Sequence, residues 1–249
     1  MARPARRNRA LIIVNDRFSS RDEEEPLQRR LGAFWEGKKL ARALSDLGYL
    51  VGLHRNCSAA RILQLFQEES QAEHGDCFVS ILSSHGQEGL VFGNQGRAVH
   101  LAQLLHTLDP RNCSALAGKP KILFIQACRG EEKDPGVWVE VDSASQDGDG
   151  TFSLLPALPE NSAVSFACCP GYGAFRGGGS SWLLETLLRL LQGEERHREL
   201  MPFLTLLNGT VARDFEAGGA FSGQKAMPCF VSTLLQEVFP FSGPLRPDP

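Results

Sequence analysis

The sequence predicts an α/β protein with a mainly parallel six-stranded sheet that is covered by helices on both faces. Six short apolar runs alternate with segments of helical periodicity. The runs are continuous rather than alternating, which is typical of strands buried on both faces. They span residues 11–15, 49–54, 77–82, 121–126, 163–169 and 229–233. In such a sheet, functional loops gather at the carboxyl ends of the strands.

The predicted helices each show an apolar stripe. One stripe consists of Leu40, Ala43, Leu44 and Leu47, and another of Ile62, Leu65 and Phe66, with Ser58 as the expected N-cap. Leucines repeat at helical spacing in residues 183–191 and 200–215, where we expect them to face the core.

The composition indicates a folded protein and gives no reason to expect nucleic acid or a membrane as partner. The chain is 42% hydrophobic and 22% charged, with a formal net charge of −3. No apolar run is long enough to cross a bilayer, and the arginine-containing residues 1–10 lack the apolar segment of a secretion signal. We therefore expect the protein in the cytoplasm, with the nucleus as the alternative.

Seven cysteines, an odd number without C-x-x-C spacing, predict reduced thiols. Most are expected to act as small apolar side chains, but Cys128 follows the run 121–126 at its carboxyl end. His85 follows the preceding run in the same way. An imidazole can take the proton of a thiol and pass it to a leaving amine, so the two residues form a candidate nucleophile and proton-transfer partner. The N–H groups of Gly86 and Cys128 are candidates for an oxyanion hole.

Residues 131–161 interrupt the periodic pattern. They contain Asp134, Asp142, Asp147 and Asp149, three prolines, and several glycines and serines. A connection of this length inside a domain is uncommon, and we expect it to be exposed.

The motifs that surround the candidate residues resemble those of the caspases. Gln-Ala-Cys-Arg-Gly at 126–130 is typical of that family, and Ser84-His85-Gly86 and Pro170-Gly171-Tyr172 extend the likeness over residues 10–241. The stretch QACRGEEKDPG and the short N-terminal segment look most like the keratinocyte-associated short-prodomain branch. The resemblance implies a caspase-like fold and endoproteolysis after aspartate by a Cys–His dyad, without a metal or organic cofactor.

The resemblance also implies a pocket for the substrate's aspartate, formed by Arg30, Gln126 and Arg176, with Phe175 at a neighbouring subsite. Guanidinium groups match a carboxylate with two parallel hydrogen bonds. Arg29 competes with Arg30 for the first position. Gly173 stands where many active caspases have a large side chain, and the glycines at 177–179 make the following loop pliant, so the preference of the neighbouring subsites stays open.

Caspases are made as zymogens, and the resemblance implies activation by a cut in the 131–161 linker. Asp142 is the expected processing site, with Asp147 and Asp149 as alternatives. The implied division is a short segment 1–10, a large subunit 11–142 with both catalytic residues, and a small subunit 162–249. Because no recruitment domain fits before Leu11, we expect activation by another protease or by dimerisation. Cleaved units are expected to form a homodimer through the edge strand at 229–233 and to act on protein substrates in apoptosis or terminal differentiation.

Two other readings stay open at this stage. A silent interaction protein with the same fold would modulate active caspases and would need none of the catalytic residues. A related peptidase that cuts after basic residues would need an acidic pocket, which the arginines oppose.

Overall fold

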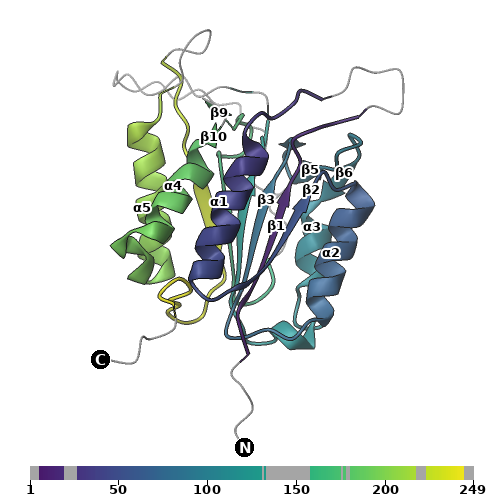
Figure 1. Cartoon of the computed structure of the whole chain (residues 1–249), viewed down its shortest axis with the longest axis vertical. Coiled ribbons are helices and arrows are strands. Elements are labelled where there is room, and N and C mark those ends of the chain that lie inside the picture. Colours follow the sequence, from purple (N-terminus) through teal and green to yellow (C-terminus); the bar gives the residue numbers. More distant parts are fainter. Residues whose placement is uncertain are drawn as a thin grey trace, which may run out of the picture.

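A six-stranded sheet forms the centre of the protein (Figure 1). The computed structural model describes residues 6–19, 27–130, 132, 158–174, 176–177, 180–216 and 223–243. The strands of the sheet are β1 (Arg9–Val14), β2 (Leu50–Arg55), β3 (Phe78–Ser83), β7 (Lys121–Gln126), β8 (Ser162–Phe166) and β11 (Cys229–Ser232). They lie in the order β11-β8-β7-β3-β1-β2, and all neighbours are parallel except β11 and β8. The predicted fold class is therefore confirmed.

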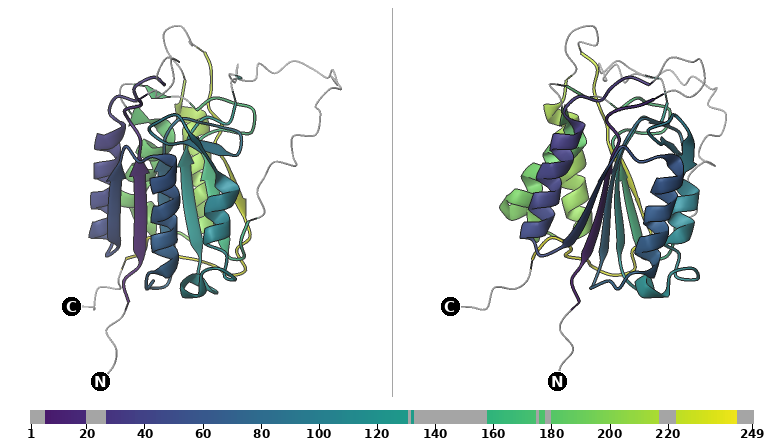
Figure 2. Two further views of the ribbon diagram at one scale, coloured as in Figure 1. Left: turned by 90° about the vertical axis from the view of Figure 1, so that its right-hand side faces the viewer. Right: turned by 45° about the vertical axis from the view of Figure 1, so that its right-hand side comes forward.

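Helices cover both faces of this sheet (Figure 2). One face carries α1 (Ala33–Asp46), α4 (Trp182–Gln192) and α5 (Leu200–Asp214), and the other carries α2 (Ala59–Gln71) and α3 (Leu101–Thr107). The side chain of Ser58 accepts a hydrogen bond from the N–H of Arg61 at 3.2 Å, so the predicted cap of α2 is confirmed. No helix within the described ranges has the length and apolar character needed to cross a membrane.

Each central strand contributes to two cores, which explains its continuous apolar sequence. In β1, Ile12 and Val14 pack with α1, α4 and α5, whereas Leu11 and Ile13 pack with α2 and α3. The same alternation recurs in β3 and β7, where Phe124 is fully buried on the side of α4 and α5. Because both faces are covered, no position of these strands needs a polar side chain.

Strand β2 departs from the prediction of burial on both faces. It ends the sheet next to β1, and Leu50 at its start is 47% exposed. Strand β11 ends the sheet on the other side and is half-buried throughout. At each end of the sheet a strand has one neighbour, so solvent reaches its outer side.

Several short elements were not predicted. A small antiparallel sheet contains β4 (Gly86–Gln87), β5 (Leu90–Phe92) and β6 (Ala98–His100), and a hairpin contains β9 (Arg176–Gly177) and β10 (Ser180–Ser181). Two short 3₁₀ helices span Ser114–Leu116 and Glu194–His197. Strands of two or three residues are too short to produce a readable periodicity.

Candidate active site

The pairing of β3 with β7 brings the segments of His85 and Cys128 together. Ser83 at the end of β3 lies opposite Gln126 at the end of β7. The pairing extends one step further, since the N–H of Ser84 donates to the carbonyl of Gln126 at 3.1 Å. His85 and Cys128 each stand two residues beyond their strand end, and both line a cavity of about 770 Å³ at this edge of the sheet.

Cys128 is half-buried in this cavity, and its sulfur faces the segment before β9. The backbone N–H of Ala174 donates to the Cys128 Sγ at 3.3 Å. The thiol of Cys128 therefore lies between the cavity and the backbone of Ala174.

The imidazole of His85 is held from two sides. Its Nε2 lies 2.7 Å from the carbonyl oxygen of Gln28, and the ring of Phe18 packs against it with centroids 4.8 Å apart. A carbonyl can only accept, so Nε2 carries the proton and Nδ1 is the basic nitrogen of the neutral ring. Burial lowers the pKa of His85, the Gln28 carbonyl opposes this, and the charges of Arg30 and Arg176 lower the pKa further. A neutral imidazole at neutral pH is the form that accepts a thiol proton.

Gly86 permits the close approach of the two segments. A Cβ at this position would lie 2.5 Å from the carbonyl oxygen of Leu90 and 3.0 Å from the Cβ of Ala127. Any side chain here would therefore push the histidine segment away from the segment that holds Cys128.

The residues after Cys128 bind the loop at 170–172. Backbone hydrogen bonds join Arg129 to Tyr172 at 2.9 Å and Gly171 to Arg129 at 3.1 Å. A Cβ at Gly130 would overlap the backbone of Gly171. The Arg129 guanidinium is buried, donates to Glu88 Oε1 at 2.7 Å and lies 4.1 Å from the centroid of the Phe166 ring. The two motifs of the sequence thus form one packed unit beside the cavity.

Arg30 presents a buried positive charge to the cavity. Its side chain donates to the carbonyl of Asn15 at 2.9 Å and to the hydroxyl of Ser83 at 3.0 Å, and the residue is 6% exposed. Burial lowers the pKa of Arg30 to about 9, and the charge of Arg176 adds to this effect. Arg29 is exposed at the rim. No carboxylate of the described residues forms an ion pair with Arg30, so an anionic ligand would relieve the cost of its burial.

Arg176 and Gln126 lie at the same cavity. Arg176 donates to Glu36 Oε2 at 3.2 Å and to the carbonyl of Leu31 at 3.3 Å. Gln126 is 2% exposed, and its Oε1 has no hydrogen-bond partner in the part of the chain that the structure describes. The predicted residues Arg30, Gln126 and Arg176 are thus brought together with His85 and Cys128. Phe175, Asp142, Asp147 and Asp149 lie outside the described residues.

Gln28 and Glu36 are among the residues of the site that the sequence analysis did not identify. Gln28 contributes only its carbonyl oxygen, which any residue type could supply, so its side chain gives no signal. Glu36 had a signal: it stands one helical turn before Leu40 on the apolar stripe of α1, where a charge is out of place.

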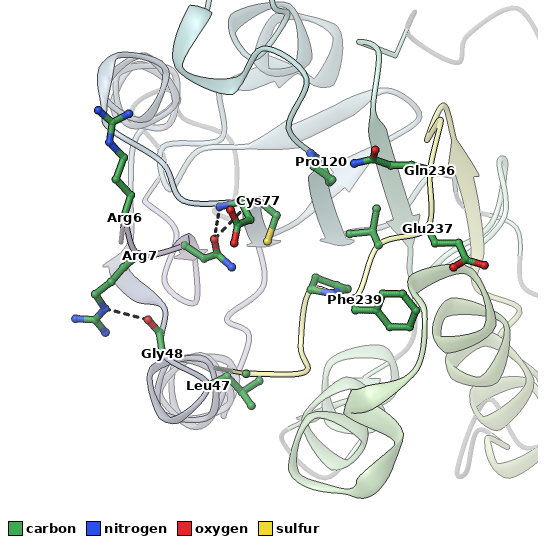
Figure 3. A pocket seen from close by; sticks show the side chains of 14 residues that line it. Arg6, Arg7, Leu47, Gly48, Cys77, Pro120, Gln236, Glu237 and Phe239 are labelled. Atoms are coloured by element: carbon green, nitrogen blue, oxygen red, sulfur yellow. Dashed lines mark hydrogen bonds between the residues drawn. The ribbon is translucent and has the colours of Figure 1, made fainter. Parts of the chain in front are cut away.

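A second cavity, of about 580 Å³, lies at the opposite, amino-terminal ends of the strands (Figure 3). This cavity is lined by Arg7 and by the residues that directly precede β1, β3 and β7, which are Asn8, Cys77 and Pro120. Burial raises the pKa of the Cys77 thiol to about 11, so this thiol stays protonated. No histidine is among the described residues that line this cavity, whereas both a cysteine and a histidine line the cavity at the other end of the strands.

The described residues contain no group of three or more His, Cys, Asp or Glu side chains placed to hold a metal ion. The groups around the cavity that can take part in chemistry or binding include the thiol of Cys128, the imidazole of His85 and the guanidinium groups of Arg29, Arg30 and Arg176.

Comparisons with known proteins point to one family. The family model described as "Caspase domain" matches residues 7–239. Caspase-3 of Bos taurus is 32% identical over 92% of the chain and 82% of its own length. Caspase-7 of Gallus gallus is 32% identical over 93% of the chain and 76% of its own length. Caspase-1 of Drosophila melanogaster is 31% identical over 84% of the chain and 66% of its own length. The crystal structure of Caspase-1 from Spodoptera frugiperda superposes with a TM-score of 0.80, covering 96% of this chain and 97% of that one at 25% identity.

The packing of Phe18 on His85 leads to a testable pH effect. Phe18→Ala uncovers the imidazole, so we expect the pKa of His85 to rise toward the ordinary histidine value of about 6.5. Phe18→Leu keeps apolar cover and should leave the pKa nearly as low. NMR titration of the ring in a Cys128→Ala background, which removes the neighbouring thiol, measures this. An unchanged or lower pKa in Phe18→Ala would show that Phe18 does not shield the ring.

Proposed function

The chain belongs to the caspase family, and from that premise we propose that it is a cysteine endopeptidase that cuts proteins after aspartate. The observation that supports this most directly is the composition of one cavity. A half-buried thiol, a neutral imidazole and the buried guanidinium of Arg30, which lacks a carboxylate partner among the described residues, border the same space.

The proposed reaction begins with a proton transfer from Cys128 to His85. The thiolate then attacks the carbonyl carbon of the scissile peptide bond, and the electron pair of the carbonyl moves onto its oxygen. In this proposal the N–H groups of Gly86 and Cys128 donate to that oxyanion. When the intermediate collapses, the C–N bond breaks and the imidazolium of His85 gives its proton to the leaving amine.

The second half of the reaction releases the acid product. His85, again neutral, takes a proton from water, and the resulting hydroxide attacks the thioester. The C–S bond breaks, and the proton returns to the sulfur of Cys128. The hydrogen bond from Nε2 to the Gln28 carbonyl keeps Nδ1 as the basic nitrogen and stabilises the imidazolium that forms twice in the cycle. The proposed reaction requires no metal or organic cofactor.

Selectivity for aspartate is assigned to Arg30, Arg176 and Gln126. Two guanidinium groups supply charge and paired donors, while the Gln126 amide adds a neutral donor. An asparagine side chain would leave buried positive charge without a counter-charge, which makes it a poor substitute. Phe175 is proposed to border the next subsite.

We assign activation to a cut in the 131–161 linker, after Asp142 or, alternatively, Asp147 or Asp149. The cut would leave His85 and Cys128 on the large subunit and Arg176 on the small one, so the two fragments must stay associated. Strand β11 ends the sheet and is free to pair with its twofold mate in a dimer of cleaved units.

The proposed role is proteolysis in apoptosis or terminal differentiation, in the cytoplasm or nucleus. Membership of the keratinocyte-associated branch stays a prediction, because the relatives above are caspases 1, 3 and 7. A silent interaction protein would not need the complete catalytic and arginine set, so no observation favours that alternative.

Kinetics with peptide libraries test the proposed activity. We expect Cys128→Ala to abolish turnover and His85→Ala to lower kcat/KM by about 10²–10⁴-fold, with both variants folded. Aspartyl peptides should be cut at least about 100-fold faster than asparaginyl ones. Turnover by purified Cys128→Ala would rule out the nucleophile, and a preference for basic or uncharged residues would rule out the pocket.

Mass spectrometry of activated protein tests the linker assignment. We expect two copurifying fragments whose masses place the cut after one of the three aspartates. The triple variant Asp142→Ala, Asp147→Ala, Asp149→Ala should stay intact and nearly inactive. Full activity of that intact variant would show that linker cleavage is not the switch.

A further inference from the structure

Glu36 is a buried carboxylate on the core-facing side of α1. Its side chain is 5% exposed, and it shares its helix face with Leu40, Ala43 and Leu44. Burying an ionised carboxylate is costly unless hydrogen bonds and an opposite charge compensate for the lost water. The contacts of Glu36 show what compensates here.

Both strands of the β9–β10 hairpin donate to this one carboxylate. Glu36 Oε1 accepts from the backbone N–H of Ser181 at 2.7 Å and from its hydroxyl at 2.8 Å. Glu36 Oε2 accepts from Arg176 Nη1 at 3.2 Å. The hairpin lies beside α1 (Figure 1). Because Ser181 and Arg176 lie opposite each other in it, Glu36 fixes both strands to α1.

The chain around Glu36 also determines where the two arginines lie. Arg30 stands three residues before the start of α1, and the carbonyl of Leu31 accepts from Arg176 Nη2 at 3.3 Å. Arg176 is therefore held by two acceptors that belong to the same stretch of chain as Arg30. The carboxylate of Glu36 therefore offsets part of the positive charge that the guanidinium groups of Arg30 and Arg176 bring to the pocket.

We propose that Glu36 is a positioning residue that orients Arg176 toward Arg30 and offsets part of the positive charge of the pocket. This inference rests on the proposed function, because it assigns the residue that prepares the aspartate pocket. In the proposed cleaved form, Glu36 belongs to the large subunit and Arg176 and Ser181 to the small one. The same contacts then join the two subunits at the substrate site.

The chain offers a matched control for the loss of a buried carboxylate. Glu69 on α2 has a side chain 9% exposed and binds Arg9 through two hydrogen bonds of 2.7 and 2.8 Å. Arg9 begins β1 at the amino-terminal end of the sheet, away from the cavity of Cys128. Glu69→Gln thus removes a comparable ion pair without touching the pocket.

The experiment compares Glu36→Gln with Glu69→Gln in linker-cut protein. A glutamine at 36 can still accept from Ser181, but its amide group turns N–H donors toward the donors of Arg176. If Arg176 is misplaced, the substrate is bound less tightly in the ground state and in the transition state to the same extent. KM for an aspartyl peptide should therefore rise about tenfold, with kcat changed less than about twofold. Glu36→Asp keeps the charge and should restore part of the loss. Glu69→Gln should lower Tm and leave KM unchanged.

Equilibrium binding gives a readout that does not depend on turnover. In a Cys128→Ala background, the affinity for a fluorescent aspartyl peptide should fall about tenfold in Glu36→Gln, which corresponds to about 1.4 kcal/mol. Ser181→Ala removes one of the three hydrogen bonds to Glu36 and keeps the ion pair, so its loss should be smaller.

Arg176→Ala separates failure of this inference from failure of the proposed function. If Arg176→Ala weakens binding and Glu36→Gln does not, Glu36 has no positioning role and the aspartate pocket stands. If neither substitution weakens binding, the pocket itself is wrong. If Glu36→Gln and Glu69→Gln raise KM and lower Tm to the same extent, the effect of Glu36 is only structural and the inference is overturned.

Discussion

The register between β1, β3 and β7 is the constraint on which the rest of the site depends. Val14, Ser83 and Gln126 lie in one row across these parallel strands. The residues that follow this row emerge at one edge of the sheet, so the catalytic candidates His85 and Cys128 line the same cavity there. The same row supplies the hydroxyl of Ser83 that holds Arg30 and places Gln126 beside it. A slip of one residue in β7 would turn Gln126 to the other face and remove it from the pocket.

The positive charges at this edge of the sheet destabilise the protein when no ligand is bound. Arg30 is buried near Arg176, and both charges disfavour protonation of His85. Glu36 offsets part of the repulsion, and a ligand carboxylate would offset the rest. A buried charge that lacks its counter-charge until a ligand binds is expected at a binding site, where local rules of folding are broken for function. The neutral imidazole that results is also the form needed to accept a thiol proton.

The central sheet was predictable because strands that are buried on both faces have continuous apolar sequences. The run at 121–126 matches β7 fully, and the other runs differ from their strands by one to three residues at an end. The strand ends then placed His85 and Cys128, and the resemblance of motifs supplied Arg30 and Arg176. What could not be predicted depends on contacts between distant segments. The role of the Gln28 backbone carbonyl and the hairpin that holds Arg176 have no local sequence pattern. The half-exposed character of β2 follows from its place in the strand order, which its own residues do not encode.

The central claim is that Cys128 is the nucleophile and lies beside a pocket that selects a carboxylate. Covalent labelling tests this claim most directly. A peptide whose C-terminal aspartyl residue carries a fluoromethyl ketone reacts when the thiolate displaces fluoride and forms a thioether. Mass spectrometry of the linker-cut protein should find one adduct, on Cys128, and almost none with the asparaginyl analogue. Arg30→Gln should slow the aspartyl reaction by at least about tenfold. Equal labelling by both peptides, or labelling of Cys169 or Cys229 in preference to Cys128, would contradict the account.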